Sequence, residues 1–242
     1  MKLHIFDNKE ILRDKLAQWI CDLVSARLKH QQFFTMVLSG GGTPKILYQK
    51  LASEKYKSKI DWTRLHVFWG DERVVPFNDE RNNAKMACDN LLNHVNIPAS
   101  QIHIMRTDIE PNFAVAEYRK LLHSFFDSTS YSFDLVLLGM GDDGHTLSLF
   151  PGSLIIEDHR RWVNAIYHET QEMYRITLMP LLVNKAREIV FMVDGEKKAP
   201  VLEKVLEGQY KPSLYPAQII SPVNGELHWF LDKDAAKNLH NI

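Results

Sequence analysis

Apolar residues recur along the chain in two patterns that alternate with each other. In the first, apolar side chains return every three or four residues, as on one face of a helix. It is clearest over residues 10–29, at Leu12, Leu16, Trp19, Ile20, Leu23, Val24 and Leu28. The second pattern is a compact, mostly apolar run that glycines end, such as 33–38. Such a run is typical of a strand that is buried on both faces of a sheet.

These patterns divide the sequence into short elements. They predict helices over residues 10–29, 44–52, 82–93, 112–126 and 196–207. They predict strands over residues 3–6, 33–38, 65–69, 102–104, 133–138, 161–166, 173–178, 188–193, 217–220 and 227–231. Alternating strands and helices imply an α/β fold, with helices on both faces of a mostly parallel sheet. Because no repeat or linker interrupts the pattern, we expect a single domain over residues 1–242.

Composition and charge exclude several classes of protein. The 242 residues are 45% hydrophobic, and 29 Lys and Arg against 30 Asp and Glu give a formal charge of -1. Near-neutral charge argues against a general binder of nucleic acids or membrane surfaces. No run approaches about 18 consecutive apolar residues, and charges interrupt the first ten positions, so we expect neither a membrane span nor a signal peptide.

The two cysteines, Cys21 and Cys88, cannot form a disulfide framework and match no metal-ligand spacing. We therefore expect a cytoplasmic protein with no nucleic-acid or membrane partner. Its oligomeric state, monomer or small homo-oligomer, is left open by the sequence.

Three polar loops, 39–44, 70–76 and 139–151, follow three of the predicted strands. In an open α/β sheet, the loops at the carboxyl ends of parallel strands share one edge, where ligands usually bind. The three loops are therefore a candidate active site.

The first loop has glycine at three successive positions, between Ser39 and Thr43. Without side chains at Gly40, Gly41 and Gly42, backbone N–H groups can approach an anion, and the start of the following helix adds favourable partial charge. The loop is either a phosphate cradle or a plain glycine turn, and it is not a Walker loop.

The third loop contains Gly139-x-Gly141-x-x-Gly144, which matches the dinucleotide fingerprint. That fingerprint needs a long helix directly after the glycines, and Pro151-Gly152 prevents one. The loop also places His145 two residues after Asp143. An imidazole in such a loop can serve as a general base that the carboxylate orients, or it can be a capping or solvated histidine.

The second loop opens with Asp71-Glu72-Arg73. These residues could bind sugar hydroxyls and a phosphate, or form a solvated charge cluster. Arg175 and Lys197 are isolated basic residues near predicted strand ends. The chain has no HExxH, CxxC or GxSxG motif, so we expect no metal and favour activated water over a covalent nucleophile such as Ser39 or Ser148.

Four segments carry a combined signature: Ser39–Pro44, Asp71–Pro76, Asn83 with Met86–Ala87, and Gly139–Gly152. Together, and in this order, they resemble the glucosamine-6-phosphate isomerase/6-phosphogluconolactonase family, and its 6-phosphogluconolactonases in particular. The resemblance covers nearly the whole chain, and the last segment is its most specific part.

The resemblance implies a fold and an activity. The fold would be a Rossmann-like sheet with a smaller β-containing elaboration, similar to glucosamine-6-phosphate deaminase and ribose-5-phosphate isomerase. The activity would be hydrolysis of 6-phospho-D-glucono-1,5-lactone, a sugar-phosphate substrate of the oxidative pentose phosphate pathway, without metal or cofactor.

The resemblance also implies roles for particular residues. His145 matches the catalytic histidine and Asp143 the aspartate of the same motif. The expected binding residues are Ser39, Gly40, Gly41, Gly42, Thr43, Asp71, Glu72, Arg73, Asn83, Arg175 and Lys197. The chain departs from the family at Asn82, where serine is usual, and at Leu147, where alanine is common.

Two alternatives stay open. A deaminase or isomerase of the same fold typically has tyrosine after Asp-Glu, where this chain has Arg73. A non-catalytic sugar-phosphate sensor would need a DNA-binding segment, and the chain has no basic extension.

Overall fold

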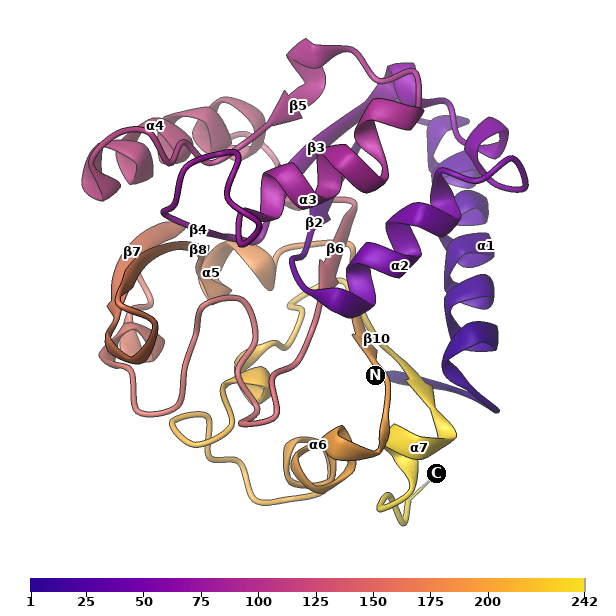
Figure 1. Ribbon diagram of the computed structural model, residues 1–242, viewed down its shortest axis with the longest axis vertical. Helices are drawn as coiled ribbons and strands as arrows, with labels where there is room; N and C mark the ends of the chain where they lie inside the picture. Colours follow the sequence, from indigo (N-terminus) through magenta and orange to yellow (C-terminus); the bar gives the residue numbers. More distant parts are fainter. Residues whose placement is uncertain (242) are drawn as a thin grey trace.

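A computed structural model describes residues 1–241 and centres on a seven-stranded sheet (Figure 1). The strand order is β1-β10-β9-β6-β2-β3-β5, and every neighbouring pair in it is parallel. The strands are β1 (Lys2–Phe6), β2 (Phe34–Leu38), β3 (Leu65–Trp69), β5 (Ile102–His103), β6 (Leu135–Leu138), β9 (Glu188–Val193) and β10 (Glu226–Asp232). A smaller antiparallel sheet has the order β4-β8-β7 and is built from β4 (Asp71–Arg73), β8 (Met173–Leu178) and β7 (Val163–His168).

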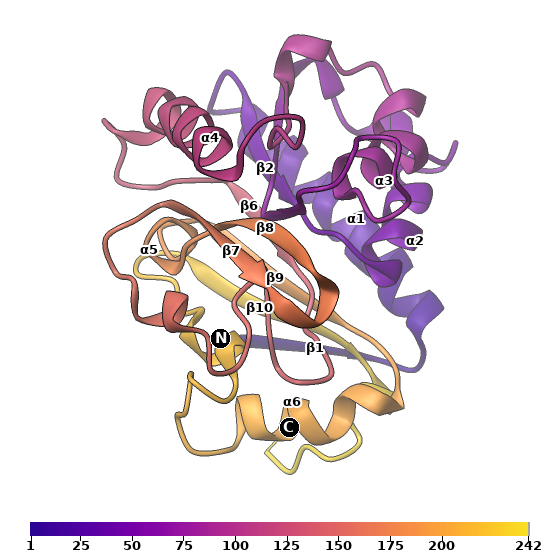
Figure 2. The same ribbon diagram turned by 60° about the vertical axis from the view of Figure 1, so that its left-hand side comes forward.

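Helices cover both faces of the large sheet. The helices are α1 (Lys9–Leu28), α2 (Gly42–Leu51), α3 (Asn83–Asn90), α4 (Pro111–Phe126), α5 (Pro180–Val183), α6 (Ala199–Leu206) and α7 (Lys233–Ala236). Figures 1 and 2 show α1, α2 and α3 gathered along one side of the molecule. Their buried residues pack with one face of the sheet, while α4 to α7 and the small sheet pack with the other face.

The alternation of side chains along each strand explains the two layers. In β2, Met36 and Leu38 pack with α1 and α2, whereas Val37 between them packs in the opposite core. All five β2 residues are buried, which accounts for the compact, mostly apolar run in the sequence. The α/β fold predicted from the sequence, with its small β elaboration, is confirmed.

Several predicted boundaries are corrected by the structure. Residues 217–220 do not form a strand: Pro216–Ile219 is a 3₁₀ turn, beginning at a proline that has no N–H to donate to a ladder. The predicted helix 82–93 ends at Asn90, and 196–207 is a 3₁₀ turn over Glu196–Lys198 followed by α6. The strand predicted over 161–166 begins two residues later, at Val163.

The largest correction concerns residues 71–73, which the sequence suggested as loop. They form β4 and pair with β8 in the small sheet, with Arg73 opposite Arg175. Three residues directly after a buried strand carry no alternation by which to recognise a second strand. Within residues 1–241, no helix has the length and apolar character needed to cross a bilayer.

Candidate active site

A cleft of about 230 Å³ lies at the carboxyl edge of the large sheet. The loops after β2, β6 and β9 line it together with β4 and β8. Among the predicted site residues, Ser39, Gly40, Gly41, Gly42, Thr43, Asp71, Arg73, His145 and Arg175 line this cleft. The three polar loops of the sequence therefore do meet at one edge, as expected for parallel strands.

The glycine loop leaves the start of α2 open toward the cleft. Gly41 precedes α2 with φ 108°, a left-handed conformation that favours glycine, and no side chain of the described residues caps the helix. The hydroxyl of buried Tyr48 holds the loop: it donates to the Ser39 carbonyl at 2.8 Å and accepts from the Ser39 N–H at 2.9 Å. The uncapped N–H groups and the helix dipole make this a place for an anion.

Gly40 is required because Asn83 lies directly against it. A Cβ at position 40 would come within 1.9 Å of the Asn83 side-chain oxygen. Asn83 is buried outside the cleft and donates from its side-chain amide to the Asp71 carbonyl at 2.9 Å. The predicted binding residue Asn83 therefore ties the glycine loop to β4.

His145 and Asp143 form a hydrogen-bonded pair at the end of β6. The Asp143 Oδ1 lies 2.6 Å from His145 Nδ1 and 3.0 Å from the His145 backbone nitrogen. Burial works to raise the pKa of Asp143, but the hydrogen bonds from His145 outweigh it and lower that pKa to about 2. An ionised carboxylate only accepts hydrogen bonds, so Nδ1 carries the proton and Nε2 is left as the basic nitrogen.

Arg73 and Arg175 are directly opposite each other in the β4–β8 pair. Like charges in this arrangement repel, and the Nε atoms of both residues are buried without a hydrogen-bond partner among the described residues. Burial and the neighbouring Arg73 lower the pKa of Arg175, against the effect of Asp71. Two arginines with unused donors at one cleft are the arrangement that an anion with several oxygens would satisfy.

Asp71 is one of the acidic residues that line the cleft. Its Oδ2 accepts from the Ser148 hydroxyl at 2.7 Å and lies 3.5 Å from Arg175 Nη1. Ser148 is fully buried, so its hydroxyl serves to orient this carboxylate. Asp71 can accept a further hydrogen bond from a ligand hydroxyl.

Glu72 does not face the cleft, contrary to its predicted role in binding. It is fully buried, and its carboxylate accepts the backbone N–H groups of Arg73, Asn83 and Ala84 at 2.7–2.8 Å. Two of these donors are the first residues of α3, so Glu72 satisfies the start of that helix from β4. Burial raises the pKa of Glu72 to about 7, against these three hydrogen bonds.

Replacing Glu72 with Gln tests this structural role. The amide has one acceptor oxygen for three N–H groups, so we expect a loss of about 1–3 kcal/mol in the free energy of unfolding at pH 7.5. Because the pKa of Glu72 is raised on folding, the folded wild type binds more protons between pH 4.5 and 7, and its stability falls as pH rises through this window. Thermal unfolding measured across this pH range should show this fall in stability in the wild type and not in Glu72→Gln. An identical pH dependence in both proteins would contradict the assignment.

Lys197 does not line the cleft, and its neighbour Lys198 does. Lys197 is exposed, whereas Lys198 lies beside the cleft with its Nζ 2.6 Å from Asp142. Both lysines belong to one 3₁₀ turn, and adjacent side chains on such a turn point in different directions. The sequence shows the turn but not which lysine faces inward.

Asp194 is a cleft residue that the sequence did not single out. It follows β9 directly, accepts from the Thr43 hydroxyl at 3.0 Å and pairs with Arg13 at 2.6 Å. A polar residue at the carboxyl end of a buried strand is the signal that could have identified it.

Both departures from the family pattern have a place in the structure. The Asn82 side chain accepts from the Lys85 N–H at 2.8 Å and caps α3, a contact that serine could also make. Leu147 lines the cleft and has φ 55°, which is strained for a residue with a Cβ.

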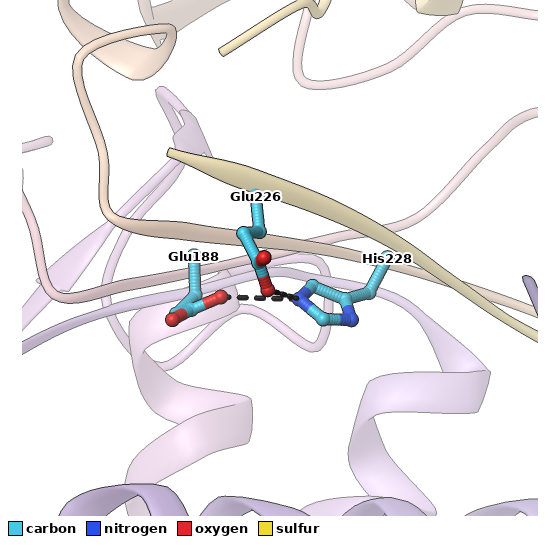
Figure 3. Close-up of side chains that lie close together, drawn as sticks. All are labelled: Glu188, Glu226 and His228. Carbon is cyan, nitrogen blue, oxygen red and sulfur yellow. Dashed lines mark hydrogen bonds and ion pairs between the residues drawn. The ribbon is translucent and has the colours of Figure 1, made fainter. Parts of the chain in front are cut away.

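One group of described side chains has the spacing of a metal site, and it lies far from the cleft. Glu188, Glu226 and His228 meet near the amino ends of β9 and β10 (Figure 3). Arg27 pairs with Glu188 at 3.0 Å and Lys2 with Glu226 at 2.5 Å, so each carboxylate already has a cation. We therefore treat the group as an ion-pair cluster.

Comparison with known proteins finds a matching family, similar sequences and similar solved structures. The family model for glucosamine-6-phosphate isomerases/6-phosphogluconolactonase matches residues 7–229. A 6-phosphogluconolactonase of a Nostoc species is 38% identical over 240 residues, covering 95% of this chain and 97% of that protein. The solved 6-phosphogluconolactonase of Trypanosoma brucei has a TM-score of 0.84 and 26% identity, over 99% of this chain and 98% of that one. A monomeric glucosamine-6-phosphate deaminase, at 19% identity and a TM-score of 0.83 over 99% and 100% of the two chains, shares the fold.

Proposed function

This chain belongs to the glucosamine-6-phosphate isomerase/6-phosphogluconolactonase family, and we propose that it hydrolyses 6-phospho-D-glucono-1,5-lactone to 6-phosphogluconate in the oxidative pentose phosphate pathway. One observation carries the proposal for the site. An oriented histidine with a free basic nitrogen shares a cleft with two arginines whose Nε groups have no hydrogen-bond partner within residues 1–241.

The reaction needs a base, an activated water and a place for developing negative charge. His145 Nε2 takes a proton from a water molecule, and the resulting hydroxide attacks the lactone carbonyl carbon. Asp143 keeps the proton on Nδ1 and stabilises the imidazolium that forms. The tetrahedral intermediate then breaks the bond to the ring oxygen, which takes the proton back from His145, leaving the open-chain acid.

Substrate binding uses the basic side of the cleft. The 6-phosphate lies against the open start of α2 and the Arg73–Arg175 pair. Asp71 accepts from a sugar hydroxyl. Binding of the phosphate positions the lactone carbonyl, at the far end of the same molecule, for attack by the activated water. The binding energy of the phosphate thereby increases the rate of hydrolysis. No metal or cofactor takes part, and the expected location is the cytoplasm.

Lys198 and Lys197 offer a matched pair of variants. We expect Lys198→Ala to lower kcat/KM for the phosphorylated lactone about tenfold, because it removes one charged donor from the cleft. Lys197→Ala removes the same charge from an exposed neighbour and should stay within about twofold of wild type. Steady-state rates above the spontaneous background decide this. Equal losses of kcat/KM in the two variants would show that the total positive charge matters and not the position of Lys198 in the cleft.

The function itself is tested against its nearest alternative by offering two substrates. The protein should accelerate acid release from 6-phosphogluconolactone and release no ammonia from glucosamine 6-phosphate. Ammonia release without lactone hydrolysis would make it a deaminase, for which Arg73 is unusual. Binding of sugar phosphates, seen as a raised melting temperature, with neither activity would make it a sensor.

A further inference from the structure

Residues 145–150 form a one-turn hairpin at the edge of the cleft. Thr146 and Leu149 make an isolated antiparallel bridge, with the Leu149 N–H donating to the Thr146 carbonyl at 3.0 Å. The residues that flank this bridge are His145 and Phe150. Their rings lie with centroids 4.6 Å apart and planes inclined at 43°.

The tip of this hairpin is strained and tightly held. Leu147 has the left-handed φ of 55° within the turn. The Thr146 hydroxyl donates to the Gly139 carbonyl at 2.8 Å, and the Ser148 hydroxyl donates to Asp71 at 2.7 Å. A non-glycine residue keeps such a conformation only where its surroundings enforce it. The bonds at Thr146 and Ser148 provide that enforcement and set the distance between His145 and Phe150.

The backbone on the other side of Phe150 is fixed as well. The Ser153 N–H donates to the Phe150 carbonyl at 3.1 Å across Pro151 and Gly152, and Gly152 has φ 73°. Proline followed by a glycine with positive φ is the sequence of a type II turn. The Gly152 N–H also donates to the Ser213 carbonyl at 2.8 Å. Phe150 is therefore held by turns on both sides.

The small sheet packs against the same phenyl ring. His168 at the end of β7 meets it edge-on, with centroids 4.2 Å apart, and the Arg175 guanidinium lies 5.8 Å from its centroid. Phe150 is half-buried and does not line the cleft. Any effect of Phe150 on a substrate must therefore pass through His145 or Arg175.

We propose that Phe150 is a positioning residue that fixes the ring plane of His145. This inference rests on the proposed function of His145. The hydrogen bond that Nδ1 donates to Asp143 holds this nitrogen but does not by itself fix the rotation of the ring about its Cβ–Cγ bond. The phenyl ring restricts this rotation, so Nε2 keeps its direction toward the attacking water.

Phe150→Leu tests the proposal, with Phe125→Leu as its control. Phe125 is also half-buried and packs against two histidine rings, His66 and His103, but far from the cleft. We expect Phe150→Leu to lower kcat for lactone hydrolysis about tenfold with KM within about twofold, because the loss lies in orientation and not in substrate binding. Phe125→Leu should lower the melting temperature about as much as Phe150→Leu does, but leave kcat and KM unchanged.

A second measurement does not depend on activity. In the wild type, NMR should show the carbon-bound ring protons of His145 shifted by the ring current of Phe150, with nuclear Overhauser contacts between the two rings. Wild-type kcat in Phe150→Leu, or a rise in KM without a fall in kcat, would overturn the proposal. Absence of the ring-current shift in the wild type would overturn it too, and this readout decides the matter if Phe150→Leu does not fold. If the wild type does not hydrolyse the lactone, the proposed function fails, while the NMR data still report whether Phe150 orients His145.

Discussion

His145→Ala should lower kcat for 6-phosphogluconolactone by about 10²–10⁴-fold, the range that a positioned general base supplies. KM should change little, because the proposed phosphate contacts lie on α2, β4 and β8 and not on His145. The measurement is the initial rate of acid release at saturating substrate, corrected for the spontaneous reaction. A loss in kcat of this size with KM unchanged marks an interaction made only in the transition state.

The chain provides a close control for this variant. His123 pairs through Nδ1 with Asp127 at 2.6 Å, the same contact and distance as between His145 and Asp143. It lies on α4 and does not line the cleft. His123→Ala should therefore keep wild-type kcat. A similar loss in the two variants would mean that the effect is not specific to the cleft.

The second large effect is expected at the paired arginines. Arg73→Ala removes a charged donor from the cleft and should lower kcat/KM for the phosphorylated lactone about 10–100-fold, mainly through KM. Arg175→Lys should act in the same direction, since lysine keeps the charge beside buried Asp71 but cannot reproduce the guanidinium fork.

The unphosphorylated lactone separates binding of the phosphate from stabilisation of the oxyanion. If the arginines hold the phosphate, the Arg73→Ala variant should lose activity on the phosphorylated substrate and keep the low activity on the unphosphorylated one. Equal losses on both substrates would instead place Arg73 at the carbonyl. Arg81→Ala is the control, because Arg81 is exposed and pairs with Asp79 beside the same loop.

Much of the fold could be predicted from the sequence because its central strands are buried on both faces. Runs such as Phe34–Leu38 have no other simple interpretation, and the polar loops that end them identify one edge of the sheet. Residues 71–73 could not be predicted as a strand, because three charged residues directly after a buried strand carry no apolar alternation. The pairing of Arg73 with Arg175 could not be predicted either, because it depends on the register between β4 and β8.

In the site too, contacts between residues close in the sequence could be predicted, whereas contacts that depend on the position of other elements could not. The pairing of His145 with Asp143 could be predicted, because the two residues are two positions apart in the same glycine-rich turn and their side chains therefore lie close together. Glu72 could not be separated from Asp71 as a structural residue. Adjacent residues of a strand point to opposite sides, and only the position of α3 shows which side is buried. The choice between Lys197 and Lys198 failed for a comparable reason, because it depends on the rotation of a single 3₁₀ turn.

The most direct test of this account is the rate of hydrolysis of freshly prepared 6-phosphogluconolactone by the wild type and His145→Ala, measured side by side above the spontaneous rate. We expect clear acceleration by the wild type and almost none by the variant, although sugar phosphates should raise the melting temperature of both proteins. Acceleration that survives the loss of His145 would contradict the proposed base, and no acceleration by the wild type would contradict the proposed function.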